Sequence, residues 1–114
     1  MTKDADKAFQ ELVRVLEEAV QAGADCLELE WEGRDLVVYQ YCGNTGLGAA
    51  SIPEELQEAV LREIIRRAKL TRKPTGTMPL TLVDKKYEVF VKQYDSFGES
   101  AFTLRLNKGR ARSR

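Results

Sequence analysis

Three glycines stand close together in YQYCGNTGLGAASIPEEL, residues 39–56, between a strand-like segment and a helix start. Glycine-rich turns bind phosphate when their backbone N–H groups meet the start of a helix. The GxxGxG spacing that begins at Gly43 matches neither the dinucleotide fingerprint GxGxxG nor a P-loop ending in GK[ST]. No lysine or arginine lies between Arg34 and Arg62 to neutralise an anion. We therefore expect a turn that leaves the sheet, not a phosphate site.

Other residue types that carry catalysis or bind metals are sparse. The chain has no histidine, and its two cysteines, Cys26 and Cys42, lie far apart without CxxC spacing, which argues against zinc and against Ser-His or Cys-His catalysis. Glu28, Glu30 and Glu32 alternate along one segment, as on the solvated face of a strand. We expect no enzyme activity, no metal and no cofactor.

A cluster of cations stands in the last turn of the second predicted helix and just after it, and consists of Arg66, Arg67, Lys69, Arg72 and Lys73. It could dock an acidic protein partner. It could equally be a solvated helix end, where cations interact favourably with the helix dipole.

The overall composition is that of an ordinary globular domain. The 114 residues are 43% hydrophobic and 32% charged, with 18 basic and 18 acidic side chains, so no net field favours nucleic acid or an anionic membrane. We expect one domain over residues 1–107 and a basic flexible tail over 108–114, whose few charges would give only weak nucleic-acid binding. No apolar run is long enough to span a membrane, and the N-terminus is not signal-like, so we expect a cytoplasmic protein without membrane insertion.

Hydrophobic periodicity predicts where the helices and strands lie. Apolar residues recur at helical spacing over 4–22 and again from Ser51 to Ala68, where Ser51 and Glu54 form a possible capping box. Alternating patterns predict a hairpin over 26–42 and three further strands over 78–106.

The predicted order is therefore α-β-β-α-β-β-β, an α+β domain with a mostly antiparallel sheet of about five strands and two amphipathic helices. The second strand of the hairpin carries apolar residues on both sides and is expected to be covered on both faces. Trp31, Tyr39 and Tyr41 could form a stacking platform for RNA, but core packing beneath a helix explains them better.

With these elements placed, the chain resembles the PAS-like domain that precedes the ATPase core in type II secretion and type IV pilus motors. The resemblance covers roughly residues 8–107 and depends on six short motifs that occur in that domain's order: GADCLELE, LVVYQYCG, IPEEL, IIRRAKL, KPTGTM and GESAFTLRL.

The resemblance implies a PAS-like fold and two further candidate site residues. Lys92 stands where the family has an arginine that faces the nucleotide between domains, and Arg105 matches the arginine of the closing strand. Walker A, Walker B and aspartate-box sequences are missing, so we expect no ATP hydrolysis by this chain, whether it is a free-standing relative or a fragment of a larger ATPase.

Three functions follow from these observations. The first is a non-catalytic interaction or regulatory domain that docks through Arg66, Arg67, Arg72, Lys73, Lys92 or Arg105 onto a secretion or pilus ATPase core or platform protein. The second is a small secretion chaperone that forms a homodimer through helix two or a sheet edge. The third is a nucleotide sensor that uses Lys92 and Arg105.

Overall fold

The computed structural model describes residues 2–108, with side chains described over residues 5–107. Within that range it contains two α-helices, one short 3-10 helix and a six-stranded antiparallel sheet with strand order β3-β2-β1-β6-β5-β4. The elements are α1 (Thr2–Ala22), β1 (Cys26–Glu32), β2 (Asp35–Cys42), β3 (Thr45–Ser51), η1 (Glu54–Leu56), α2 (Gln57–Ala68), β4 (Thr75–Leu82), β5 (Lys85–Ser96) and β6 (Glu99–Lys108). The predicted α+β class is confirmed, in an arrangement consistent with a PAS-like fold but with six strands rather than five.

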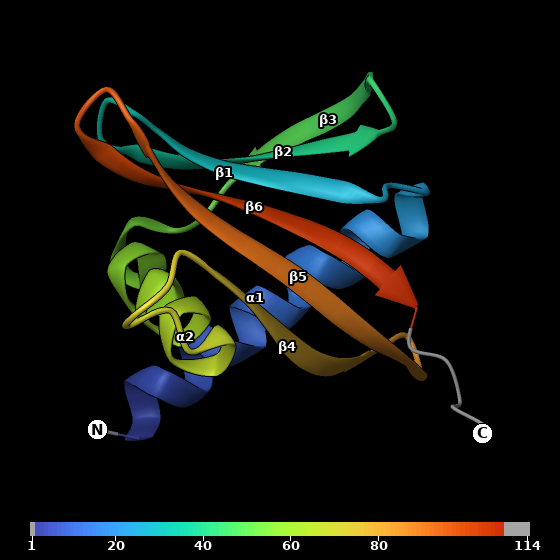
Figure 1. Cartoon of the computed structure of the whole chain (residues 1–114), viewed down its shortest axis with the longest axis horizontal. Coiled ribbons are helices and arrows are strands. Elements are labelled where there is room, and N and C mark those ends of the chain that lie inside the picture. The colour runs from blue at the N-terminus through green and yellow to red at the C-terminus, as the bar shows by residue number, and fades with distance from the viewer. Residues whose placement is uncertain (1, 109–114) are drawn as a thin grey trace.

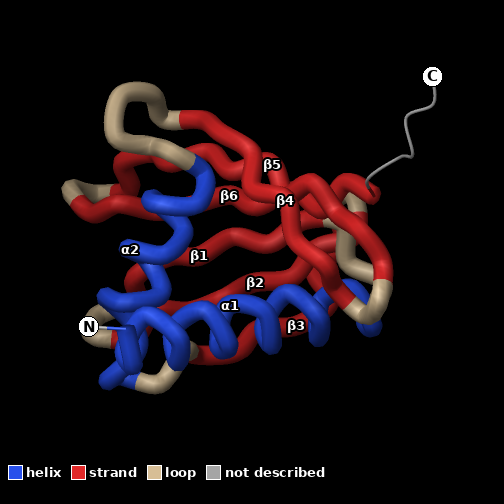
Figure 2. The backbone as a smooth tube through the Cα atoms, turned by 90° about the horizontal axis from the view of Figure 1, so that it is seen from below, coloured by secondary structure: helices blue, strands red, loops and turns tan. Residues whose placement is uncertain are grey.

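Both helices lie on one face of the sheet, and the opposite face is open (Figures 1 and 2). The strands show this asymmetry, since Leu27 and Leu29 of β1 are buried while the residues between them are only partly covered. One continuous core lies between the helices and the sheet. Its largest fully buried side chains come from α1, α2 and four strands: Phe102, Leu12, Leu16, Leu27, Leu29, Leu36, Ile64, Met78, Leu82, Leu104, Val38 and Val60.

Helix α1 forms as its periodicity predicts. Its buried residues recur every three or four positions, from Ala8 through Leu12 to Ala19. Gly23 ends the helix with φ 85, a left-handed conformation that glycine adopts without strain. The Ala24 N–H donates to the Ala19 carbonyl at 2.9 Å, which satisfies one of the last carbonyls of the helix.

Helix α2 begins later than predicted and without the proposed capping box. Ser51 is the last residue of β3, and neither η1 nor α2 has a side-chain cap. The buried amide of Gln57 anchors the start of α2 instead, because its Nε2 donates to the carbonyl of Arg34 at 3.2 Å and to that of Ile52 at 3.4 Å. A tertiary contact, not a side-chain cap, therefore positions the start of α2.

The glycine-rich stretch is not a turn that leaves the sheet, and this prediction was wrong. Gly43, with φ 60, and Asn44 make the turn, and Thr45–Ser51 form the edge strand β3, which pairs with β2 with a bulge between Gln40 and Tyr41. All seven residues of β3 are exposed. This strand is the sixth, which the predicted element order lacked.

The prediction that β2 is covered on both faces was also wrong. Leu36 and Val38 are buried beneath the helices, whereas Tyr39 and Tyr41 alternate with them and lie partly covered on the open face. Trp31 does pack against the core, as expected. The two tyrosines therefore belong to the open surface, not to the core.

Near the C-terminus, β6 extends through Lys108, one residue into the predicted tail, and residues 109–114 of that tail lie outside the described range. Among the helices within residues 2–108, neither is long and apolar enough to cross a membrane.

Candidate functional site

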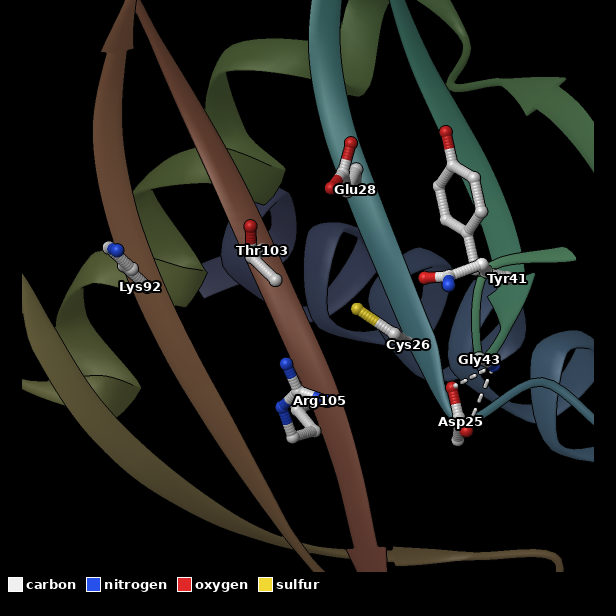
Figure 3. A pocket seen from close by; sticks show the side chains of 9 residues that line it. Asp25, Cys26, Glu28, Tyr41, Gly43, Lys92, Thr103 and Arg105 are labelled. Carbon is white, nitrogen blue, oxygen red and sulfur yellow. Dashed lines mark hydrogen bonds between the residues drawn. The ribbon is translucent and has the colours of Figure 1, made fainter. Parts of the chain in front are cut away.

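A concave pocket of about 620 Å³ lies on the open face of the sheet (Figure 3). Lys92 comes from β5, whereas Thr103 and Arg105 come from β6. The opposite side is built from β1, the end of β2 and the turn after it. Those lining residues are Asp25, Cys26, Glu28, Tyr41, Gly43 and Asn44.

Strand register brings these side chains together. Residues directly opposite each other in antiparallel strands share a face of the sheet. One row crosses from Lys92 through Thr103 and Glu28 to Tyr39. A second row crosses from Phe90 through Arg105 and Cys26 to Tyr41. The pocket thus combines residues up to 80 positions apart in the chain, between Asp25 and Arg105.

Asp25 fixes one end of the pocket. Its two carboxylate oxygens accept hydrogen bonds from the Gly43 N–H at 3.3 and 3.2 Å, drawn as dashed lines in Figure 3. Its backbone N–H donates to the Tyr41 carbonyl at 2.9 Å, and its carbonyl accepts from Leu106 at 2.9 Å. Asp25 therefore holds β1, β6 and the β2–β3 turn together, and its carboxylate is already engaged.

The charges of the pocket are divided between its two sides. Lys92 and Arg105 lie on the β5–β6 side, and Glu28 lies on β1 (Figure 3). None of the ion pairs found among residues 5–107 includes Lys92 or Arg105. Two cations and a carboxylate facing the same hollow can bind a ligand that carries both charges, such as a peptide segment with acidic and basic side chains.

Two side chains that line the pocket, Cys26 and Tyr41, have raised pKa values. Burial raises the pKa of the Cys26 thiol, and the nearby Arg105 only partly offsets this. Burial, together with the charges of Glu28 and Glu30, raises the pKa of Tyr41. The raised pKa values favour the neutral thiol and phenol at pH 7.

Tyr94 of β5 borders this region and spans two strands. Its hydroxyl donates to Glu30 Oε2 at 3.0 Å, and its strand partner Ala101, which is 1% exposed, lies on β6 between them. Burial and the hydrogen bond to Glu30 raise the pKa of Tyr94 to about 12. On the far side of β1, the Tyr39 hydroxyl donates to Glu32. Glu30 and Glu32, which the sequence places on a solvated strand face, therefore orient Tyr94 and Tyr39 on the open face of the sheet.

The structure divides the six predicted site residues into two groups. Lys92 and Arg105 both line the pocket. The other four, Arg66, Arg67, Arg72 and Lys73, lie at the end of α2 or in the loop that follows it, and none of them lines the pocket.

The two helical arginines are held by local contacts. Arg66 Nη2 and Arg67 Nε both donate to Glu63, at 2.9 and 2.8 Å. The Arg67 guanidinium also lies 3.7 Å from the centroid of the Phe9 ring, a cation–π contact between α2 and α1. Arg72 and Lys73 are exposed.

The remaining pocket residues were not singled out from the sequence as a binding set. The alternation over 26–32 predicts that Glu28 lies on the solvated face of a strand, but it does not show which strands lie beside it. Thr103 carried no signal of its own. No group of three or more His, Cys, Asp or Glu side chains in the described part of the chain is arranged to hold a metal ion.

Fold and site together define a small α+β domain with one helix-covered and one open sheet face. Neither protein-family models nor characterised protein sequences give a match to this chain.

Proposed function

We propose that this chain is a non-catalytic protein-interaction domain of the cytoplasm that binds its partner through the open face of the sheet. The observation that carries the proposal is the convergence of Lys92 and Arg105 with Glu28 in one concave pocket. Lys92 and Arg105 stand at positions where the resembled regulatory domain has arginines. In the register of β5 and β6 the two side chains lie on the same face of the sheet.

A binding role accounts for this site better than catalysis does. The displaced pKa values of Cys26, Tyr41 and Tyr94 all lie further from neutrality than usual, so these groups are not adapted to transfer protons at pH 7. Tyrosine and arginine, which this face presents at Tyr41 and Arg105, are instead enriched at protein interfaces.

The resemblance to the PAS-like domain of secretion and pilus motors suggests the kind of partner. A secretion or pilus ATPase core, or a platform protein of the same machinery, is the first partner to test. The nucleotide-sensing alternative is weaker, because Glu28 and Asp25 add negative charge to the pocket in which a triphosphate would have to bind.

Site-specific photocrosslinking in the producing cells tests this proposal. Tyr41 is replaced by p-benzoylphenylalanine, which keeps an aromatic ring at the pocket. We expect crosslinking to one discrete protein, identified by mass spectrometry, and at least a tenfold loss of that product when Lys92→Glu and Arg105→Glu are combined, a loss of about 1.4 kcal/mol.

The matched control combines Arg72→Glu with Lys73→Glu, which changes the net charge by the same amount at the loop after α2. This variant should crosslink as the wild type does. If it loses the product while the Lys92 and Arg105 variant keeps it, the partner docks at the helix end and the proposal is wrong.

A small dimeric secretion chaperone is the second candidate, and the exposed edge strand β3 favours it. Such a protein would need a surface for a second copy, and β3 presents a whole strand to solvent.

A further inference from the structure

Within residues 2–108, strand β3 has a neighbouring strand on one side only, so its outer backbone groups pair with none of the described strands. It lies at one end of the strand order, and all seven of its residues are exposed. An edge strand presents a row of free N–H and C=O groups to which another strand can be added.

The direction of these groups follows from one hydrogen bond. The Ile52 N–H donates to the Leu36 carbonyl at 3.0 Å, which marks these two residues as a hydrogen-bonded pair. Such pairs alternate along an antiparallel ladder. Gly48 and Ala50, which oppose Gln40 and Val38, therefore turn their backbone groups towards β2, and Ala49 turns its own outward.

Folded proteins usually prevent a further strand from pairing with such an edge. In this sheet a feature of that kind is found at the opposite edge strand, β4, and not at β3. The opposite edge strand, β4, contains Pro79, which has no N–H. The Gln93 N–H donates to the Pro74 carbonyl at 2.7 Å, so by the same alternation Pro79 faces outward. β3 contains neither proline nor a charged residue.

The composition of β3 favours a second copy of this chain as the added strand. From Val37 to Pro53 there is no charged residue, although 32% of the whole chain is charged. Two copies can therefore meet there without like charges facing each other. Gly48 has no side chain, and the methyl groups of Ala49 and Ala50 are small enough to be self-complementary about a two-fold axis. Leu47, which is 42% exposed, adds an apolar contact.

We propose that β3 pairs with β3 of a second copy in an antiparallel arrangement centred on Ala49, which joins two six-stranded sheets into one. At the centre, each Ala49 N–H would donate to the Ala49 carbonyl of the other copy. The open-face pocket lies on other strands, so this interface does not depend on the function proposed for the pocket.

Sedimentation equilibrium of the full chain over a wide concentration range tests the proposal. The wild type should have twice the 12.9 kDa mass of the monomer. Ala49→Pro removes an outward N–H without removing a hydrogen bond to β2, and it should halve that mass. Ala49→Lys, which sets two ammonium groups opposite each other at the axis, should do the same.

The matched control is Thr77→Pro on β4. Thr77 precedes Pro79 by two residues and also turns its N–H outward, so this variant should remain dimeric, as should the combined Lys92→Glu and Arg105→Glu variant. A wild type that is monomeric throughout would overturn the proposal and leave a strand of another protein as the occupant of β3. The proposal would also be wrong if the Ala49 variants were dimeric or if the Thr77→Pro variant were monomeric. Circular dichroism verifies that each variant is folded.

Discussion

Glu63 is a buried carboxylate that already binds two arginines of α2, Arg66 and Arg67. It is 4% exposed and accepts hydrogen bonds from both Arg66 and Arg67. Burial by itself raises the pKa of Glu63, but the hydrogen bonds and charges of the two arginines outweigh this effect and lower it. Binding an acidic partner through Arg66 and Arg67 would compete with this existing network, whereas none of the ion pairs among residues 5–107 engages Lys92 or Arg105.

Glu63→Gln should therefore destabilise the domain at neutral pH. Because the folded pKa lies below the unfolded value of about 4.3, the ionised carboxylate stabilises the fold above that pH, and its contribution is lost as the pH falls through the folded pKa. We expect a loss of about 1–3 kcal/mol at pH 7 in urea unfolding, shrinking as the solution is acidified.

Glu58→Gln, at an exposed position of the same helix, is the control and should change the free energy of unfolding by less than about 0.5 kcal/mol. Equal losses in the two variants, or a Glu63→Gln effect that does not depend on pH, would show that the carboxylate is not held by the arginines.

At the scale of the element, the junction between α2 and β4 depends on a close backbone approach. A Cβ on Gly76 would lie 1.9 Å from the Ala68 carbonyl oxygen and 3.0 Å from its carbon. The last turn of α2 therefore rests directly on the first residues of β4, and only glycine leaves room for it.

Gly76→Ala should force α2 and β4 apart and destabilise the domain by about 1–3 kcal/mol in urea unfolding. Gly46→Ala in β3 is the matched control, since a Cβ there meets only Tyr41 Cε1, at 3.9 Å. Its effect should stay within about 0.5 kcal/mol. If Gly46→Ala were as costly as Gly76→Ala, loss of glycine itself, not the helix contact, would explain both results.

The elements that the sequence predicts well are those with large apolar side chains at regular spacing, such as α1 and β5. Periodicity does not predict β3, because its sequence TGLGAAS has no alternating large apolar residues. The strand forms because its backbone pairs with β2. The Gly43–Asn44 pair, a hairpin signal, could have revealed it. The pocket is predictable from the sequence only in part. Alternation places Glu28 and Arg105 on strand faces, but only the register between β1 and β6 shows that they lie close together.

At the scale of the whole molecule, one face of the sheet packs against the helices and forms the core, and the other face is open. Both helices lie on the same side, so the stability of the domain comes mainly from a single core, and residues on the other side can change without unfolding it. This separation suits a binding domain, since a partner surface can then vary independently of the fold.

Two phenylalanines on neighbouring strands test this division. Phe102 of β6 is fully buried beneath the helices, and Phe90 of β5 lies on the open face, 37% exposed. Phe102→Ala should reduce the free energy of unfolding by about 3–5 kcal/mol, because it leaves a cavity in the core. Phe90→Ala should cost about 1 kcal/mol or less, since it removes a side chain that is already partly in water. Urea unfolding of both variants gives the comparison, and a Phe90→Ala loss as large as that of Phe102→Ala would mean that the open face is covered in solution and cannot be the free binding surface of this domain.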